Sequence, residues 1–434
     1  MECNNLVKRA AKVVKLINGT ATASAKRSFA EKAKAAFIFF KDSVMTKNNT
    51  PDQAAFFRTL AAGDRDQIQA IVSAEPQILE CFDYGQFGAT PLTWACFSNR
   101  TDLVELLIEL GADPNRRSDW HMGPWSPLHC AIFRRDKDLA MLLISKGAVQ
   151  DVHTAAGLGD CDTILNLLDS DPTRVNERGG DGCQPLHFAD TVDVARLLLE
   201  RGAEINGRCI DHHSTPVQYL CTTRPKVAQF LLATGATSDI VSSAACGDTG
   251  SIEKLLRENP DLINVRVNQT FFPPVTEQNV HNTMTFSLGL DATALHAAAK
   301  GDSSAAVSLL VDHGLSPNVR GGYDHATPLH LAAWSNCNES ALALVNHGAD
   351  IEARSGKLHN NTPAGWSIVA GADTVFELLM DRGAQYYPWF LDDARDACAG
   401  RFDQISRASK DQRLRILSRL ETDRSKTRGN YSGM

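Results

Sequence analysis

Thr327-Pro328-Leu329-His330-Leu331-Ala332-Ala333 decides the fold, because this stretch returns in intact or altered form through most of the chain. The other copies of its first four residues are Thr90-Pro91-Leu92-Thr93, Ser126-Pro127-Leu128-His129, Gln184-Pro185-Leu186-His187, Thr215-Pro216-Val217-Gln218, Thr293-Ala294-Leu295-His296 and Thr362-Pro363-Ala364-Gly365. A repeat period of about 30 to 35 residues predicts a stacked array of small units.

A second motif follows the first one. The stretch Leu106-Leu107-Ile108-Glu109-Leu110-Gly111-Ala112-Asp113-Pro114-Asn115 returns in altered form at 197–206 and 309–318. Threonine before proline caps a helix, and proline fits the first helical position. Glycine after a leucine-rich helix fits a left-handed C-cap. Each unit is therefore predicted to be helix, turn, helix and an extended finger.

The two motifs together resemble the ankyrin-repeat family, from about Asp52 to about Leu420. The resemblance implies an all-α ankyrin-repeat solenoid of about 10 to 11 helix–turn–helix units with β-hairpin or extended fingers and a helical N-terminal cap. Units are expected to begin near residues 52, 88, 124, 151, 182, 213, 239, 291, 325, 360 and 389. In the unit near 182, the first helix is about three residues short of the usual register.

The chain divides into five segments on this pattern. They are a basic, partly helical segment (1–50, a cap or a targeting segment), a first block of repeats (51–266), an inserted long finger (267–290), a second block with a degenerate C-terminal cap (291–421) and a disordered tail (422–434). Insertions in a solenoid collect on one face, which is usually the binding face.

Charge is distributed unevenly along the chain. Residues 1–48 carry 10 Lys/Arg and 3 Asp/Glu, residues 401–434 carry 9 and 4, and the residues between carry 25 and 44. An acidic array is expected to attract basic protein partners and to disfavour specific nucleic-acid binding. The alternative is that these charges only keep faces and tails solvated. No stretch of about 18 apolar residues is present to span a membrane, and contact of residues 5–17 with a membrane is not favoured.

Cysteine usage predicts a reducing compartment. The chain has 11 cysteines, none in a Cys-x-x-Cys pair, and no hydrophobic signal segment at its start. Several, such as Cys96, Cys130 and Cys246, occupy small-residue helix positions and are expected to be buried thiols. We therefore expect a cytoplasmic protein, with the nucleus or an organelle as alternatives.

Histidines fall into two groups. The family resemblance implies a structural role for His129, His153, His187, His296 and His330, which hold the repeat's own histidine position. Other histidines lie in fingers with aspartate and aromatic residues. The candidate partner-binding residues are Trp120, His121, Trp125, His212, His213, Phe271, Phe272, His281, Tyr323, His325 and His359. Trp120 and Trp125 are expected to be exposed anchors for a partner.

Fingers of successive units line up along one edge, so these residues are expected to converge. They would form a protein contact surface, a small-ligand pocket, or a catalytic or metal site. Because no phosphate loop, nucleophile elbow or recognised metal-ligand spacing is present, the sequence predicts no catalytic residue, metal or cofactor. The leading hypothesis is a protein-interaction scaffold or adaptor that uses its concave face and fingers. The alternative is an ankyrin-scaffold enzyme or small-ligand-binding protein.

The family resemblance also suggests a modification. Asparagine at a finger position after a leucine-rich helix is a known hydroxylation target in ankyrin proteins of animal cells. Asn115, Asn206 and Asn318 match that context.

Deleting residues 1–48 is predicted to lower the melting temperature by several degrees and to increase binding of a hydrophobic dye. The reason is the run Phe37-Ile38-Phe39-Phe40, which a soluble protein should bury, and the need of the first repeat for a cap. The alternatives are that residues 5–17 target a membrane or organelle, or that translation starts at Met45. Identical melting curves for the full chain and for a chain starting at Met45 would refute the cap.

Overall fold

The computed structural model describes residues 49–268, 270, 282–356, 362–402, 406 and 408–431, with side chains up to residue 423. In these residues eleven helix pairs follow one another, and we number them as units 1 to 11. The pairs are α3 (Pro51–Ala62) and α4 (Arg65–Ala74); α5 (Pro91–Phe97) and α6 (Thr101–Glu109); α7 (Pro127–Phe133) and α8 (Lys137–Ser145); α9 (Val152–Leu158) and α10 (Cys161–Ser170); the 3₁₀ helix η5 (Pro185–Phe188) and α11 (Val192–Glu200); α12 (Pro216–Leu220) and α13 (Pro225–Ala233); α14 (Ile240–Cys246) and α15 (Thr249–Glu258); α17 (Ala294–Lys300) and α18 (Ser304–Asp312); α19 (Pro328–Ser335) and α20 (Asn338–Asn346); α21 (Pro363–Ala370) and α22 (Asp373–Asp381); α23 (Pro388–Cys398) and α24 (Lys410–Tyr431).

The connections between pairs differ in length. They contain 3₁₀ turns, namely η2 (Pro76–Glu80), η3 (Pro172–Asn176), η4 (Gly180–Gly182), η6 (Pro260–Asn264) and η7 (Tyr323–His325). The described residues form no β-strand, and three isolated bridges join residues 83 and 89, 266 and 293, and 321 and 326. The predicted all-α solenoid is therefore confirmed, with fingers that are extended rather than regular hairpins.

The first helix of each pair begins as the motif predicts. Thr90 Oγ1 accepts a hydrogen bond from the backbone N–H of Thr93 at 3.1 Å, and Ser126 Oγ accepts one from His129 at 3.2 Å. Small residues then let first helices approach closely. At Gly157 in α9, a Cβ atom would lie 2.1 Å from Ile132 Cγ2 of α7, so a larger residue there would push the two helices apart.

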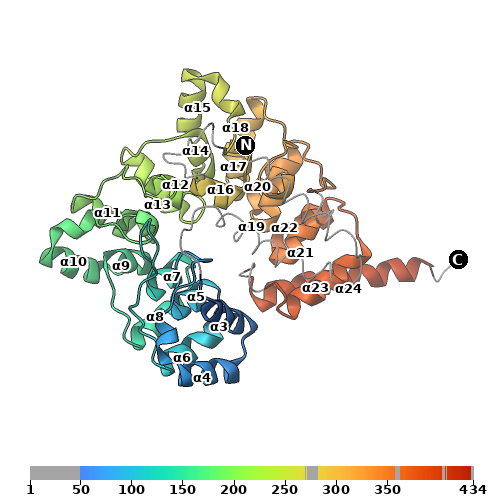
Figure 1. The fold of residues 1–434 in the computed structure, drawn as a ribbon. Helices are drawn as coiled ribbons and strands as arrows, with labels where there is room; N and C mark the ends of the chain where they lie inside the picture. Colours follow the sequence, from blue (N-terminus) through green and yellow to red (C-terminus); the bar gives the residue numbers. More distant parts are fainter. Residues whose placement is uncertain are drawn as a thin grey trace, which may run out of the picture.

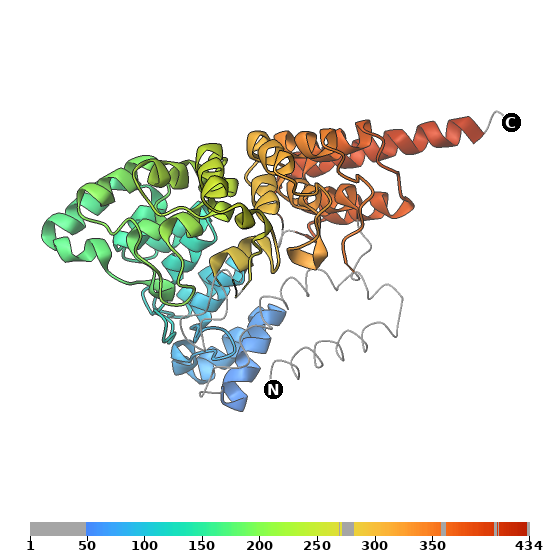
Figure 2. The same ribbon diagram turned by 90° about the horizontal axis from the view of Figure 1, so that it is seen from above.

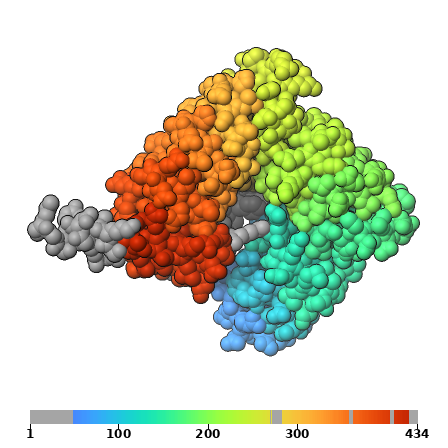
Figure 3. Space-filling model, turned by 180° about the vertical axis from the view of Figure 1, so that it is seen from behind, coloured from blue at the N-terminus to red at the C-terminus, as the bar shows by residue number. Residues whose placement is uncertain are grey.

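The pairs stack into a superhelical arc. Figure 1 shows the first helices, such as α5, α9, α14 and α19, on the inside of the arc and the second helices, such as α6, α10 and α15, on the outside. The turned view separates the first units from the last, so the arc does not close into a flat ring (Figure 2). Seen from behind, the described units surround a central hollow (Figure 3). The inside of the arc is the concave face of the array.

Unit 5 tightens the arc. Its first helix, η5, has only four residues, as the short register of this unit predicts. The helix turns of units 3 and 6 consequently meet across units 4 and 5, where Arg135 Nη1 donates a hydrogen bond to the Thr223 carbonyl oxygen at 2.7 Å. Contacts in most solenoids join only adjacent units. Units 3 to 6 are therefore held together more firmly than a simple stack.

One histidine side chain links successive units. His296 Nδ1 accepts a hydrogen bond from the backbone N–H of Thr293 at 3.2 Å, so its other nitrogen, Nε2, carries the proton. Nε2 then donates to the carbonyl oxygen of Ala326, at the base of the next finger, at 3.1 Å. His187 bonds the Ser214 carbonyl oxygen in the same way at 3.0 Å. These rings are buried, as their predicted structural role requires.

The segment predicted as an inserted long finger (267–290) ends in a helix that belongs to the stack. Helix α16 (Thr283–Leu288) packs against α12, and its Met284 and Leu288 are fully buried. The Thr283 hydroxyl donates a hydrogen bond to Ser214 Oγ at 2.7 Å. The prediction of a finger is therefore corrected for 282–290, because the apolar side chains of this part fill the space beside α12.

The C-terminal helix α24 covers the last units. Its Ile416 and Leu420 are buried, and Arg415 Nε lies 2.6 Å from Asp373 Oδ2 of α22. The helix continues to Tyr431, so the predicted disordered tail (422–434) is corrected as far as residue 431. The ion pair of Arg419 with Asp423, four residues later at 3.0 Å, supports this continuation. The predicted N-terminal cap (1–48) lies outside the described residues.

Lowering the pH from about 6.5 to about 4 is predicted to reduce the free energy of unfolding. Burial lowers the pKa of His129, His187 and His296 to about 4, whereas the unfolded chain binds these protons near pH 6.5. Because the pKa of each histidine is lower in the folded chain than in the unfolded chain, its contribution to the free energy of unfolding is complete above pH 6.5. This contribution is lost on acidification and amounts to about 3 kcal/mol per histidine.

Urea unfolding at pH 7, 5.5 and 4.5 measures this effect. Replacing the exposed His121 with glutamine should leave the pH dependence unchanged, since this ring is not buried. A constant free energy of unfolding across this range would contradict the prediction.

Candidate functional site

Finger tips of three units lock together on one edge of the array. The backbone N–H of Asp181 in unit 5 donates a hydrogen bond to the Gly123 carbonyl oxygen of unit 3 at 3.2 Å. The Asp181 carbonyl oxygen accepts from the N–H groups of Ile210 and Asp211 of unit 6 at 3.1 and 3.0 Å. Gly123 has a φ of 138°, and a Cβ there would lie 2.2 Å from the Gly179 carbonyl oxygen. Glycine is therefore required for this contact.

The same edge continues toward unit 9. The His212 ring lies against the Phe286 ring of α16, with centroids 5.0 Å apart. The Tyr323 hydroxyl of unit 9 donates a hydrogen bond to the Phe286 carbonyl oxygen. We call this continuous line, formed by Gly123, Asp181, 210–212, Phe286 and Tyr323, the finger edge. The finger histidine and aspartate residues of units 5 and 6 therefore lie close together. The alignment of all fingers along this edge stays a prediction for those fingers that have residues outside the described part of the chain.

Two carboxylates and one imidazole come together on the finger edge. His212 Nε2 lies 3.7 Å from Asp181 Oδ2 and 3.5 Å from Asp211 Oδ2, and these side chains are 15 to 19% exposed. Trp125 Nε1 donates a hydrogen bond to the other Asp181 oxygen at 2.9 Å, which fixes that carboxylate. Such a group of acceptors favours a cationic group from a partner. The sequence did not indicate Asp181, because it lies in a Gly-Asp-Gly turn that gave no site signal.

The expectation that Trp125 is an exposed anchor is wrong. The residue is 4% exposed, because its ring fills the space over Gly180, where a Cβ would lie 2.6 Å from the indole. Trp125 also packs against Phe133 and Phe188, with ring centroids 5.3 and 6.3 Å apart. It therefore joins units 3 and 5 from within. Trp120 is half-buried, and its ring contacts His121 at 4.6 Å between centroids.

The other predicted contact residues differ in exposure. His121, Tyr323 and His325 are exposed, and His213 is half-buried with a φ of 48°. Burial lowers the pKa of His213, so this ring stays neutral near pH 7. Phe271, Phe272, His281 and His359 lie outside the described residues. Among the finger histidines that the structure describes, His212 lies 3.7 and 3.5 Å from two carboxylates, and a partner-binding role for this set stays a prediction.

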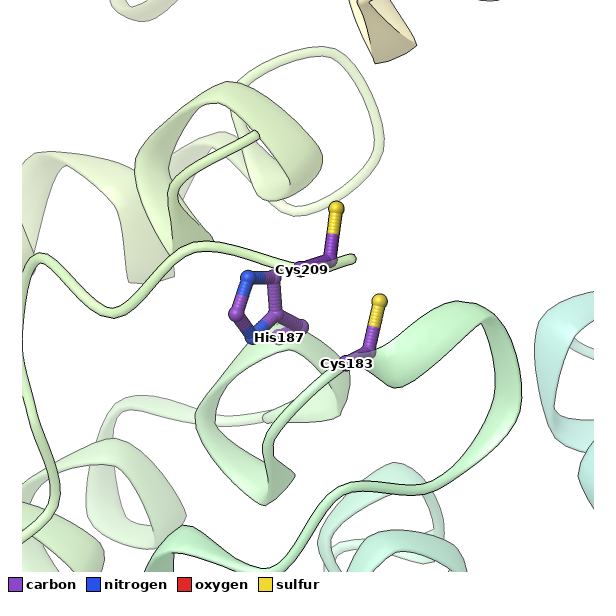
Figure 4. Close-up of side chains that lie close together, drawn as sticks. All are labelled: Cys183, His187 and Cys209. Atoms are coloured by element: carbon purple, nitrogen blue, oxygen red, sulfur yellow. The ribbon is translucent and has the colours of Figure 1, made fainter. Parts of the chain in front are cut away.

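A buried thiol pair lies just beneath the finger edge. Cys183 and Cys209 come from consecutive fingers, and their sulfur atoms and a His187 nitrogen all lie within 4.8 Å of one another (Figure 4). A hydrogen bond from the Cys183 thiol lowers the pKa of Cys209 to about 7. Both His187 nitrogens are already bonded to backbone groups, Nδ1 to Gln184 and Nε2 to Ser214. His187 therefore serves the stack, and its ring offers no lone pair to a metal.

The described cysteines form no disulfide with one another, and Cys96, Cys130 and Cys246 are buried as predicted. A pocket of about 140 Å³ lies at the helix turns of units 3 to 6. Its cationic side chains are occupied, since Lys137 Nζ and Arg224 Nε lie 3.1 and 2.9 Å from Asp190. The pocket therefore holds internal ion pairs rather than a recognisable ligand site.

The predicted hydroxylation sites have a structural role. Asn115 Nδ2 donates to the Gly147 carbonyl oxygen at 2.9 Å, and its Oδ1 accepts from the N–H of Val149 at 2.8 Å. Asn318 makes the same two bonds to Gly348 and Asp350 of the next unit. Asn206 Oδ1 accepts from the Thr237 N–H at 2.7 Å. Hydroxylation of these residues stays a prediction.

Replacing Trp125 with alanine is predicted to lower the free energy of unfolding by about 3 to 5 kcal/mol, because it leaves a cavity between units 3 and 5 and an unpaired Asp181 oxygen. Replacing the half-buried Trp120 with alanine is the control and should cost much less. Chemical unfolding of both variants measures the difference. Equal, small losses would show that the indole of Trp125 is not part of the core.

Comparisons with known proteins agree with this architecture. The family model described as ankyrin repeats (3 copies) matches residues 54–154 and 240–355, together half of the chain. The ANK repeat-containing protein nipk-1 of Caenorhabditis elegans is 32% identical over 134 residues, which are 30% of this chain and 20% of that protein. Mouse protein phosphatase 1 regulatory subunit 27 is 31% identical over 121 residues, which are 28% of this chain and 73% of that protein.

Several other matched relatives are much longer, and the chain spans a fifth or less of their length. Among solved structures, the human ASB11 ankyrin repeat domain is 24% identical with a TM-score of 0.31, and the match covers 55% of this chain and all of that one. No helix in the described part of the chain has the length and apolar character needed to cross a bilayer. The repeated motif, the helix pairs and the family match together show that this chain belongs to the ankyrin-repeat family.

Proposed function

We propose that the chain is a scaffold or adaptor that holds a basic segment of another protein against its finger edge and concave face. Ankyrin repeats are generally protein–protein interaction modules, and this chain is built from them. One relative is named a regulatory subunit of protein phosphatase 1, which is consistent with action through another protein. The partner of this chain is a matter for experiment.

The observation that carries the proposal is the combination of side chains on the finger edge with Leu290, which lies beside it. Leu290 and Tyr323 are 43% and 44% exposed, although both are large apolar or aromatic residues. They lie next to each other, because the N–H of Gly322 donates to the Leu290 carbonyl oxygen at 2.8 Å. Phe286 connects them to His212 and the carboxylates of Asp181 and Asp211. Apolar anchors beside acidic groups fit a partner that has apolar and basic residues in one segment.

The charge of the array supports the same partner chemistry. Residues 49–400 carry 25 Lys/Arg and 44 Asp/Glu, so the array as a whole has a negative net charge. A field of this sign speeds encounter with a basic partner and weakens as salt is added. We therefore expect the association rate to fall with ionic strength, with a smaller effect on dissociation.

The test begins with capture on the full chain and identification of the bound protein by mass spectrometry, followed by binding of the two purified proteins. The double variant Leu290→Asp/Tyr323→Ala should bind the partner about tenfold more weakly or worse, equivalent to about 1.4 kcal/mol. Replacing Met141, which is 58% exposed on the outer helix α8, with aspartate is the control and should change nothing.

Melting curves must show that both variants remain folded. Equal binding by the wild type and the Leu290/Tyr323 variant would contradict the proposed edge. A partner whose affinity does not change with salt would contradict the proposed basic chemistry.

A further inference from the structure

The joint between units 3 and 4 differs from the joints at His187 and His296. At those two joints the repeat histidine donates its Nε2 proton to the backbone carbonyl just before the next helix cap, as His187 does to Ser214. Unit 4 has no finger, and Asp151 itself caps α9. His129 Nε2 therefore faces a carboxylate, Asp151 Oδ2, at 3.3 Å. This His129 nitrogen is fully buried and has no aligned hydrogen-bond partner among the described residues.

A second imidazole nitrogen points at the same carboxylate. His153 Nε2 lies 2.9 Å from the Glu177 carbonyl oxygen, a bond that places the proton on Nε2 and leaves a lone pair on Nδ1. Nδ1 lies 3.9 Å from Asp151 Oδ1 and, like His129 Nε2, has no hydrogen-bond partner in the described part of the chain. A buried lone pair that faces a carboxylate oxygen is unfavourable unless a cation lies between them.

The chain contains its own comparison for this joint. Unit 7 also lacks a finger, and Asp239 caps its first helix as Asp151 caps α9. There the position of His129 is taken by Gln218, whose Nε2 donates to Asp239 Oδ2 at 3.1 Å. The position of His153, two residues after the aspartate, is taken by Val241. Stacking at such a joint therefore needs one donor to the aspartate and no second imidazole.

We propose that His129 Nε2, His153 Nδ1 and a carboxylate oxygen of Asp151 bind one divalent transition-metal ion, with Zn²⁺ as the best match. The three donor atoms lie within 4.8 Å of one another, and tetrahedral Zn²⁺ with bonds of about 2.0 to 2.1 Å requires separations of roughly 3.4 Å. Two imidazoles and a carboxylate are a usual donor set for Zn²⁺ and leave a fourth position for water. Asp151, the most exposed of the three, is the side from which water and the ion enter.

The surroundings already orient the ligands. Each histidine has its other nitrogen engaged, His129 Nδ1 with Ser126 Oγ at 2.8 Å and His153 Nε2 with the Glu177 carbonyl oxygen. Contacts of this kind hold metal-binding imidazoles in position. Burial lowers the pKa of His129 to about 4 and also lowers that of His153, so both rings are neutral near pH 7. Two neutral imidazoles and an ionised carboxylate can then bind the ion without releasing a proton, because the N–H of His129 can lie on Nδ1 and point to Ser126 Oγ.

Arg117 neutralises the carboxylate when no metal is bound. Its Nη2 lies 2.9 Å from Asp151 Oδ2, and its side chain is 43% exposed, so it can move into solvent as the ion takes its place. Arg117 and the metal ion therefore compete for Asp151. A bound ion would join α7 of unit 3 to α9 of unit 4 and should raise the melting temperature.

The experiment uses the purified full chain after treatment with EDTA, titrated first with Co²⁺ as a spectroscopic probe and then with Zn²⁺. We expect one ion per chain, visible ligand-field bands without thiolate-to-cobalt charge transfer, and displacement by Zn²⁺. His129→Gln copies the Gln218 joint and should fold, yet it should weaken binding by about 100-fold or more, since loss of a ligand exceeds loss of an outer contact. Arg117→Gln should tighten binding by about tenfold, which a purely structural role of these residues would not produce.

Cys209→Ser and His121→Gln are the controls, because thiols or exposed imidazoles elsewhere also bind Co²⁺. Both should bind the ion like the wild type. Circular dichroism and melting curves in EDTA establish that each variant is folded. The proposal is overturned if the wild type binds no ion, if His129→Gln binds as tightly as the wild type, or if the bands show thiolate charge transfer that is lost in Cys209→Ser.

Discussion

Joints of the stack depend on buried side chains that satisfy backbone groups in two successive units at once, and the repeat histidine is the clearest case. In His296, Nδ1 accepts from the helix cap of its own unit and Nε2 donates to Ala326 of the next unit. Removing such a ring would leave two buried polar groups without partners, and each would cost about 1 to 3 kcal/mol. The ring does this while neutral, so the interior of the array contains no charge at these joints. The Asn115 and Asn318 amides repeat the principle at the outer turns.

Carboxylates lie beside polar side chains at the joints where this arrangement is interrupted. Units 4 and 7 lack fingers, so an aspartate replaces the usual threonine cap and places a carboxylate where a backbone carbonyl would stand. At one joint Gln218 compensates for that change. At the other, the same change brings Asp151 against His129, whose family position would make it purely structural, and against His153, which lies one residue before that position in its own unit because Thr154 occupies it. A position in a repeat motif therefore does not fix the role of its residue, because the next unit supplies half of its environment.

The period and the capping residues were enough to predict the solenoid, the order of its units and the short first helix of unit 5. They did not predict the burial of Trp125, because the length of a finger carries no information about which neighbouring backbone it will cover. Gly180 was the available signal, since a residue without a side chain leaves room for an indole.

The clusters were hidden for a related reason. Cys183 and Cys209, or Asp181 and His212, are separated by a full repeat in sequence and become neighbours only through stacking. No local spacing motif records such pairs. The break in the repeat period predicts a finger over 282–290. The fit of Met284 beside α12 depends on the stacked structure and cannot be seen in the period.

The bond from Arg135 to Thr223 gives the array a property that a simple stack lacks. In a one-dimensional series, bending is shared among all joints, and each joint yields independently. Because this bond ties unit 3 to unit 6 past the two units between them, those four units resist bending as one block. Bending is therefore expected mainly in the arms on either side, units 1 and 2 and units 7 to 11. A change in the angle between those arms would alter the width of the central hollow and leave the curvature at unit 5 unchanged.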